Sequence, residues 1–570
     1  MSRIANLLDR RGWVSVWAVL AVPIVYGASF PMARLAFIGW IGFIPWFVAV
    51  RRASMRKALL ICGVSTLLGS YACTPWLPRA VANYYQQPLI LGLLLFAGVY
   101  LVTIGPFVAA FVLGFQRLGR RPSMWLPVLT ALLWAGAEAA RTRLLVGDPF
   151  GVFGYSQVDF TYLTQIADVT GVFGLTVLPM AVNAAFAELW LAYATSPSQE
   201  AVRTARPWPR VATVAQAWQG VAVVTAMVLA VGAYGAVRIR SFDRAGSEPS
   251  TPIGIVQANL DLGAQWRQEF YGRNLEEYMR LTIDVLHAYK PRVVFWPESS
   301  MTFFLENEPT YRAALGYLLS PTQTQLVAGG PRSIGEAPPR YYNAGLLIGP
   351  DGSVLAAYDK QRLLPFAEYF PFGGSALLRR KFARVREFTA GGPANVLPTL
   401  AGPAGVVICN EVMFGELVAE RVRAGARYIV ALANDSWLGD RQYAEEAFDM
   451  ARMRAVEQHQ YVVRASTSGP SAIIDPLGRV VTRTDDETRA TMGGRIRPVA
   501  AQTVYARYGD VFGLCCVLIP LSVLLWDWAA ARRSRRYAGR AAYEEAAAAR
   551  SEWSATDACE ARGSGARSKP

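Results

Sequence analysis

The sequence predicts a multi-pass α-helical membrane domain of about eight spans plus an inserted extracytoplasmic α/β domain. Three observations support this prediction. Hydrophobic residues make up 53% and charged residues 17% of the 570 residues, which is too apolar for an ordinary soluble protein of this size. Long apolar runs recur through residues 1–237 and again at 511–530. Between them, at 238–510, short β-rich runs alternate with amphipathic helical stretches.

Each predicted span rests on an apolar run, because about 20 apolar residues are needed to cross a hydrocarbon core of ~30 Å. Residues 1–237 are therefore expected to form a transmembrane domain of about seven spans. The second run is short and the fifth contains Glu138. Residues 531–570 are rich in Ala, Arg, Glu and Ser, and we expect a disordered cytoplasmic tail there. The runs occupy residues 13–30, 36–50, 57–76, 88–115, 124–140, 170–194, 217–237 and 511–530.

The distribution of Lys and Arg sets the expected orientation, because cytoplasmic loops carry an excess of both. If the N-terminus is cytoplasmic, the basic loops share its side of the membrane and the alternate loops are poorer in Lys and Arg. An even number of spans then places both termini in the cytoplasm and residues 238–510 outside it. A basic start followed by an apolar run is also compatible with a signal peptide, but the further runs favour an uncleaved span. The basic loops hold Arg51, Arg52, Arg56 and Lys57, then Arg117, Arg120 and Arg121, then Arg203, Arg206 and Arg210.

Composition also limits the expected partners and cofactors. The formal net charge of +15 does not indicate nucleic-acid binding, because the basic residues lie beside apolar runs and no basic domain is interleaved with aromatic residues. With two histidines and no CxxC pair, we expect no metal site and no cofactor. Of the six cysteines, only Cys409 lies in 238–510, so no disulfide can form within that segment.

The segment 238–510 predicts a sheet layered between other elements. Strand-like runs include IGIVQANL at 253–260, RVVFWPE at 292–298 and GVVICNE at 405–411, and a helix is expected near 269–289. Continuously apolar strands such as VVIC are typical of strands that are buried on both faces. The expected class is an α/β or α+β sandwich.

Three loops of this segment place polar groups where buried strands or a hairpin end. Glu298 follows one apolar strand, and Cys409 ends another with Glu411 two residues on. Lys360 leaves a hairpin, with Glu368 eight residues later. Taken alone, a Cys at a strand end is usually a small core residue, and a Glu or Lys in a loop is usually solvated. Cys409 stands out because an unpaired thiol in an oxidising compartment is prone to oxidation, which favours a functional role for it.

The three motifs resemble the Glu-Lys-Cys triad of the nitrilase superfamily. WPES contains Glu298, YDKQRLLPFAEYFP contains Lys360 and ICNE contains Cys409, in the order and approximate spacing of that triad. Together with the spans, GYSQ at 154–157 and NDSWLGD…ARMRAVE at 434–457 are similar to one branch of the superfamily, the apolipoprotein N-acyltransferases.

The resemblance covers about residues 13–530, nearly everything except the tail. Two local departures stand out. The segment before GYSQ reads GDPFGVF where a more aromatic run is expected, and Asn410 stands where members of the family carry Tyr. Neither departure touches the triad, but both bear on the fit of lipid or lipoprotein.

The resemblance implies a membrane-embedded N-acyltransferase of the cell inner membrane with an αββα nitrilase-type sandwich. It implies that an acyl chain passes from a phospholipid, phosphatidylethanolamine, to the N-terminal α-amine of a diacylglyceryl-cysteine apolipoprotein, the last step of lipoprotein maturation. Cys409 would be the nucleophile, Glu298 the general base and Lys360 the neighbouring charge, in an enzyme expected to be monomeric. The supporting or substrate-binding residues would be Glu368, Glu411, Asn343 and Trp437.

These residue types suit ping-pong acyl transfer, because a thiolate attacks an ester and gives a thioester that an amine can attack later. A free Cys has a pKa near ~8.5 and a free Glu near ~4.3, so unaided proton transfer costs about 5–6 kcal/mol. Burial raises the pKa of the carboxyl group and a neighbouring ammonium lowers the pKa of the thiol, so the difference between the two pKa values becomes smaller. Lys360 can also face the oxyanion of the tetrahedral intermediate, where loss of one donor lowers the rate by about 10²–10³.

Other interpretations stay open at this point. A membrane-tethered nitrilase-type amidase would use the same triad on a small amide, although several spans would then be superfluous. A non-catalytic scaffold is disfavoured because Glu298, Lys360 and Cys409 are all present. A transporter is disfavoured because charged residues are scarce inside the spans.

Overall fold

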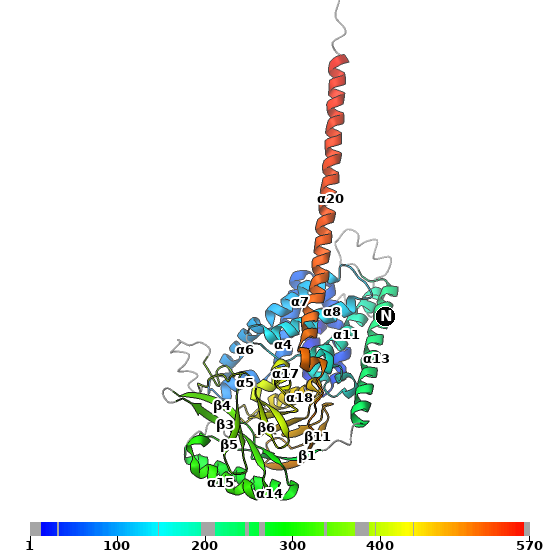
Figure 1. Ribbon diagram of the computed structural model, residues 1–570. Coiled ribbons are helices and arrows are strands. Elements are labelled where there is room, and N and C mark those ends of the chain that lie inside the picture. The colour runs from blue at the N-terminus through cyan, green and yellow to red at the C-terminus, as the bar shows by residue number, and fades with distance from the viewer. Residues whose placement is uncertain are drawn as a thin grey trace, which may run out of the picture. The chain divides into compact units, whose positions relative to one another are not determined.

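The computed structural model describes residues 13–30, 34–145, 147–194, 211–244, 250–260, 268–335, 339–370, 387–393, 395–436 and 438–563. The chain divides into two compact units, Met1–Val517 and Leu518–Pro570. The first unit contains the apolar helices and the α/β domain (Figure 1). The second contains most of the last helix, α20 (Val511–Gly563).

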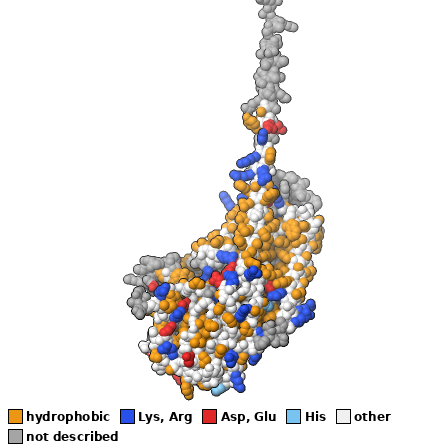
Figure 2. Space-filling model, viewed as in Figure 1, with side chains coloured by type: hydrophobic (Ala, Val, Ile, Leu, Met, Phe, Trp, Pro, Cys, Tyr) orange, Lys and Arg blue, Asp and Glu red, His pale blue; other side chains and the backbone are white. Residues whose placement is uncertain are grey.

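Apolar helices make up the N-terminal part of the first unit. Across the described ranges of both units, three helices are long and apolar enough to cross a membrane: Val172–Ala194 and Val214–Arg244 in this part and Val511–Ser534 near the C-terminus. Up to five spans result if each of two bent helix pairs counts as one. Many large hydrophobic side chains of these helices are exposed, among them Leu60, Ile90, Leu101 and Leu229, and Figure 2 shows hydrophobic side chains over much of the helical part. The helices are α2 (Trp13–Ser29), α3 (Ile44–Arg52), α4 (Met55–Cys73), α5 (Trp76–Asn83), α6 (Leu89–Thr103), α7 (Gly105–Leu118), α8 (Leu126–Arg143), α9 (Thr161–Thr164), α10 (Ala167–Thr170), α11 (Val172–Ala194) and α13 (Val214–Arg244).

Three apolar or tail segments differ from what the sequence led us to expect. The run at 36–50 is split into the 3-10 helix η1 (Ala36–Trp40) and the nine-residue α3, which has a proline in its first turn. The run at 88–115 is bent by 45° between α6 and α7, where another proline begins the second helix. Residues expected to be disordered continue α20 as helix to Gly563, because Ala, Arg and Glu favour helix.

Two six-stranded sheets form the centre of the α/β domain, in the orders β12-β1-β2-β3-β4-β5 and β11-β10-β9-β8-β7-β6. Three neighbouring strands of each sheet are parallel, β1-β2-β3 and β7-β8-β9, and the remaining pairs are antiparallel. The strands are β1 (Thr251–Gln257), β2 (Val293–Phe295), β3 (Gln325–Ile334), β4 (Arg340–Ile348), β5 (Val354–Asp359), β6 (Val396–Thr399), β7 (Gly402–Ile408), β8 (Tyr428–Ala433), β9 (Val462–Ser466), β10 (Ala472–Ile474), β11 (Val480–Arg483) and β12 (Ala490–Ile496).

Helices cover the outer face of each sheet, which confirms the expected sandwich (Figure 1). α14 (Tyr271–Tyr289) and α15 (Pro309–Leu319) pack on the first sheet. α17 (Gly415–Arg423) and α18 (Arg441–Gln458) pack on the second sheet, and one continuous core joins them to the apolar helices. The α/β domain therefore contacts the helical part through the α17–α18 layer.

Strand β2 and strand β7 are buried on both faces. Val293 and Phe295 point into the core between the sheets, whereas Val294 packs toward α14. In β7, Ile408 belongs to the same central core and Val407 faces α17 and α18. Alternating residues enter different cores, so neither strand has a solvent face. Polar groups are confined to the strand ends, where the candidate site lies.

Candidate active site

The three predicted functional groups come from the ends of three strands. Glu298 follows β2 of the first sheet, Lys360 follows β5 of the same sheet, and Cys409 follows β7 of the second sheet. The structure brings these groups together: Lys360 Nζ lies 3.9 Å from Glu298 Oε1, and the Cys409 thiol is close enough for the charges of Glu298 and Lys360 to act on its pKa.

Cys409 occupies the turn between β7 and the short 3-10 helix η6 (Cys409–Met413). Its backbone has φ of +53°, in the left-handed region that residues with a Cβ rarely adopt. This turn leaves the side chain half-buried, whereas Ile408 before it and Asn410 after it are buried. The thiol is thus held where a substrate can reach it.

Lys360 is buried, and a neighbouring carboxylate holds its ammonium group in place. Its Nζ lies 2.8 Å from Glu368 Oε2, and its exposed fraction is only 1%. The loop that carries Glu368 folds back, because Leu364 N donates to Glu368 Oε2 over 2.8 Å. Glu368 thus lies beside Lys360 and pairs with its ammonium group.

Asn343 connects the two carboxylates that face Lys360. It lies on β4, and its Nδ2 donates to Glu298 Oε1 over 2.8 Å and to Glu368 Oε1 over 2.7 Å. The backbone carbonyl of Asn343 also accepts from Lys360 N over 2.8 Å. One amide therefore fixes the orientation of both carboxylates and the start of the Lys360 loop.

Burial dominates the electrostatics of the site. Desolvation raises the pKa of Glu298, the Lys360 ammonium opposes that shift, and Glu368 adds to it. Desolvation alone would lower the pKa of Lys360, but Glu368, Cys409 and Glu298 outweigh it, so the pKa is raised and the ammonium stays charged.

The thiol pKa differs from the expectation for an activated cysteine. Burial and the Glu298 charge raise the pKa of Cys409, and the opposing effect of Lys360 is smaller. The resting sulfur is therefore a protonated thiol next to a carboxylate. Proton transfer to Glu298 must accompany the approach of the electrophile, since the neighbouring ammonium alone does not hold a thiolate.

Glu411 lies behind Cys409 and is fully buried. Its carboxylate accepts from Ile408 N over 2.8 Å and from Gln361 N over 2.8 Å. It also accepts from Arg362 N over 3.0 Å and from Tyr358 Oη over 2.8 Å. Glu411 thereby ties the strand that ends at Cys409 to the loop that follows Lys360.

One residue near the sulfur was missed by the sequence analysis. The Tyr443 hydroxyl lies 4.0 Å from Cys409 Sγ, and its ring packs on Trp76 with centroids 5.0 Å apart. No pattern in the sequence points to Tyr443. The segment QYAEE resembles any helix start, and Tyr443 lies 34 residues from Cys409 along the chain. The predicted supporting residue Trp437 lies outside the described residues.

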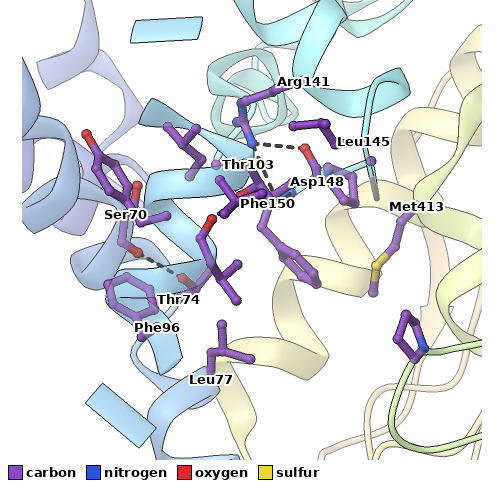
Figure 3. A pocket seen from close by; sticks show the side chains of 18 of the residues that line it. Ser70, Thr74, Leu77, Phe96, Thr103, Arg141, Leu145, Asp148, Phe150 and Met413 are labelled. Atoms are coloured by element: carbon purple, nitrogen blue, oxygen red, sulfur yellow. Dashed lines mark hydrogen bonds and ion pairs between the residues drawn. The ribbon is translucent and has the colours of Figure 1, made fainter. Parts of the chain in front are cut away.

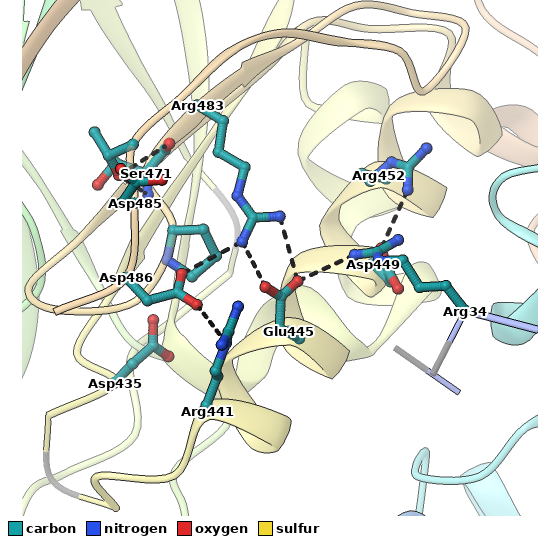
Figure 4. A network of polar contacts seen from close by, with 12 residues as sticks. Arg34, Asp435, Arg441, Glu445, Asp449, Arg452, Ser471, Arg483, Asp485 and Asp486 are labelled. Atoms are coloured by element: carbon teal, nitrogen blue, oxygen red, sulfur yellow. Dashed lines mark hydrogen bonds and ion pairs between the residues drawn. The ribbon is translucent and has the colours of Figure 1, made fainter. Parts of the chain in front are cut away.

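An ion-pair network fixes α18, the helix that carries Tyr443 (Figure 4). Arg34, from the segment before η1, lies with its Nη2 3.2 Å from Glu445 Oε2. Arg483 pairs with the same carboxylate from the other side. At its start, α18 is capped by Asp440, whose side chain accepts from the backbone N–H groups of Gln442 and Tyr443. Groups from both parts of the unit thus hold the helix beside the sulfur.

A large apolar cavity of about 1540 Å³ adjoins the site. Leu77, Phe96 and Phe150 from the helical part line it together with Met413 from the α/β domain (Figure 3). Tyr443 lines it as well, so the cavity reaches the side chain that contacts the sulfur. An extended apolar group can lie in the cavity while its polar end meets Cys409.

Comparison with known proteins accounts for both parts of the chain. The model of the carbon-nitrogen hydrolase family matches residues 253–505, and that of the apolipoprotein N-acyltransferase N-terminal domain matches residues 23–185. The apolipoprotein N-acyltransferase of Geobacter metallireducens is 31% identical over 500 residues, which cover 87% of this chain and 91% of that protein. The chain belongs to the apolipoprotein N-acyltransferase family. It is therefore an enzyme of the acyltransferase class.

A further relative agrees with this apolipoprotein N-acyltransferase assignment. The enzyme of that name from Azotobacter vinelandii is 28% identical, over 92% of this chain and 96% of that protein. Among solved structures, an amidase of the nitrilase superfamily from Nesterenkonia AN1 is 17% identical, covers 45% of this chain and 93% of that chain, and has a TM-score of 0.34.

The two segments in which the sequence analysis noted local departures both border the cavity. In the GDPFGVF segment, the Phe150 ring packs on Trp76 with centroids 4.8 Å apart. Asp148 of the same segment lies 3.6 Å from the Arg141 guanidinium (Figure 3). Asn410 lines the cavity directly after the cysteine. The GDPFGVF segment and Asn410 thus both lie at the surface of the cavity.

Proposed function

We propose that this enzyme transfers a fatty acyl chain from a phospholipid to the N-terminal α-amine of diacylglyceryl-cysteine apolipoproteins. One observation carries the proposal: Cys409, Glu298 and Lys360 converge beside an apolar cavity lined by both the membrane helices and the α/β domain. Phosphatidylethanolamine is the donor that we propose.

In the first half-reaction, Glu298 takes the thiol proton as Cys409 attacks the ester carbonyl of the phospholipid. The Lys360 ammonium, anchored by Glu368, stabilises the negative charge that develops on the carbonyl oxygen. The ester C–O bond breaks, and Glu298 returns the proton to the departing glycerol oxygen. Lysophospholipid leaves, and the acyl chain remains on Cys409 as a thioester.

In the second half-reaction, the α-amine of the apolipoprotein attacks the thioester carbonyl. The C–N bond forms, the C–S bond breaks, and Glu298 moves one amine proton toward the sulfur. An amide and a free thiol result. Asn343 and Glu411 take no part in bond making in this scheme, and they hold Glu298 and the two catalytic loops in place.

The substrates explain why the enzyme has membrane helices, because exposing an acyl chain to water costs ~0.8 kcal/mol per CH₂. We propose a monomer in the cell inner membrane, with about eight spans, cytoplasmic termini and the α/β domain on the extracytoplasmic side. In that arrangement the cavity opens at the level of the outer leaflet. A phospholipid then reaches Cys409 without leaving the bilayer.

The deciding experiment is to incubate the purified protein with phosphatidylethanolamine and to measure the mass of the peptide that contains Cys409. We expect a fatty-acyl mass increment that is absent in Cys409→Ala and is discharged by a diacylated lipopeptide. A folded protein that never gains this mass would refute the proposal. Hydrolysis of a small amide without any acyl increment would support the membrane-tethered amidase instead.

A further inference from the structure

Asn410, which follows the nucleophile, has a buried oxygen that makes no hydrogen bond. The side chain is 6% exposed, and its Oδ1 has no partner among the described residues. Its Nδ2 donates to the carbonyl oxygen of Arg362 over 3.2 Å, which fixes the plane of the amide. A buried acceptor without a donor is unfavourable, so such a group in a native protein calls for an explanation.

The position of Asn410 suggests what supplies the missing donor. The residue lines the apolar cavity beside Cys409, whose sulfur bears the acyl group in the proposed reaction. The cavity wall around Asn410 consists of the apolar Met413 and Phe414 and the polar Gln361 and Arg362, and none of these is hydrogen-bonded to Asn410 Oδ1 among the described residues. A ligand group that stands over the thioester can therefore donate to Asn410 Oδ1.

The chemistry of the two half-reactions distinguishes the candidate donors. An ester has no N–H or O–H group, so the ester end of the acyl donor cannot donate a hydrogen bond to Asn410 Oδ1. A neutral primary amine carries two N–H groups and one lone pair. As the lone pair attacks the thioester, Glu298 accepts one N–H proton, and the second N–H would remain unpaired in an apolar cavity.

We propose that Asn410 Oδ1 accepts the second N–H of the attacking α-amine and thereby orients the acceptor substrate. This inference rests on the proposed function and assigns a residue to the second half-reaction alone. The C–N bond forms and the C–S bond breaks as described above, and Asn410 neither gains nor loses a proton. The residue selects a primary amine, because a thiol or an alcohol presents only the hydrogen that the base removes.

The test loads Cys409 with an acyl chain from phosphatidylethanolamine vesicles and follows its discharge by mass. Two nucleophiles are compared on the full-length protein: a diacylated lipopeptide with a free α-amine, and dithiothreitol, which has no N–H. In Asn410→Leu we expect normal loading and normal discharge by dithiothreitol, but discharge by the lipopeptide slowed about tenfold. Asn410→Asp keeps an oxygen acceptor at the same place and should discharge to the lipopeptide faster than Asn410→Leu.

A second measurement changes the acceptor substrate. A lipopeptide methylated on its α-nitrogen has one N–H, so it should discharge the wild-type thioester more slowly than the primary amine does. Asn410→Leu should then discharge the two lipopeptides at similar rates. Equal rates for both lipopeptides on the wild-type protein would overturn the inference, and so would an equal slowing of dithiothreitol and lipopeptide by Asn410→Leu. Failure of the wild-type protein to load would instead refute the proposed function.

Discussion

The Lys360 ammonium lies 2.8 Å from Glu368 Oε2, closer than the 3.9 Å that separates it from Glu298 Oε1. The strongest ion pair of the buried cation is thus made with a carboxylate outside the predicted triad. Because Lys360 is almost fully buried, the pair with Glu368 both fixes the ammonium and compensates its desolvation. Glu298 remains available to bind a proton.

Glu368→Gln should therefore weaken catalysis without touching the nucleophile. The amide cannot compensate the Lys360 charge, so the ammonium moves toward Glu298 and leaves the position where it stabilises the oxyanion. We expect the rate of Cys409 acylation to fall by about 10²-fold, measured in a single turnover with phosphatidylethanolamine. Glu276→Gln, an exposed carboxylate on α14, is the matched control. Equal rates for Glu368→Gln and this control would show that Lys360 needs no anchor.

Asn343→Ala should change the pH dependence of acylation. The Asn343 amide donates to Glu298 and so lowers its pKa, against the larger raising effect of burial. Without that donor the pKa of Glu298 rises further. The general base must be ionised, so activity is lost as the pH falls through this pKa, and the acidic limb of the rate profile should move to higher pH.

The measurement is the single-turnover rate of Cys409 acylation as a function of pH, for wild type and Asn343→Ala. The alkaline side of the profile serves as the internal control, because Glu298 is ionised there in both proteins. An acidic limb that stays in place, or one that moves to lower pH, would contradict the proposed role of Glu298 as the base.

The parts of this site that could be predicted are those for which the signal lies in neighbouring residues of the sequence. Apolar strands that end in a polar residue placed Glu298 and Cys409 at sheet edges, because strands buried on both faces tolerate polar groups only at their ends. Turn residues located the hairpin before Lys360 in the same way, since Gly352 has φ of +80° between β4 and β5. These signals lie within a few residues of the groups that they predict.

The remaining features depend on contacts between distant parts of the chain. Tyr443 meets Cys409 only because α18 packs on the second sheet. Likewise, the net rise in the pKa of the Cys409 thiol follows from burial and from the Glu298 charge, both of which depend on packing between distant parts of the chain. The bend between α6 and α7 was missed because a hydropathy window averages over a proline that starts a new helix.

Tyr443→Phe tests whether the hydroxyl beside the sulfur takes part in the reaction. Burial raises the pKa of Tyr443, so the phenol stays protonated and can donate to the developing thiolate. The Phe side chain keeps the ring contact with Trp76 and removes only the donor. We expect Cys409 acylation to slow by about tenfold, measured by intact mass after rapid quenching. Tyr278→Phe also removes a buried hydroxyl, from the separate core between α14 and the first sheet, and should acylate at the wild-type rate.

Glu411 and Glu420 offer a matched test of a buried against an exposed ion pair, because both face the same buried Arg421. Glu411 Oε1 lies 4.0 Å from Arg421 Nη2 in the interior, whereas Glu420 Oε2 lies 3.6 Å from Arg421 Nη1 and is 48% exposed. Glu411→Leu leaves the Ile408 and Gln361 N–H groups without their acceptor and leaves Arg421 without its buried counter-charge.

We expect Glu411→Leu to lower the free energy of unfolding in detergent by about 3–5 kcal/mol. Glu420→Leu should change it by at most about 1 kcal/mol, because water screens the exposed pair. Acylation of Cys409 should fall in the first variant only, since the bonds of Glu411 join β7 to the loop after Lys360. If the two variants unfolded with equal free energies, the buried pair would stabilise Arg421 no more than the exposed pair does, and Glu411 would have no special part in holding the nucleophile.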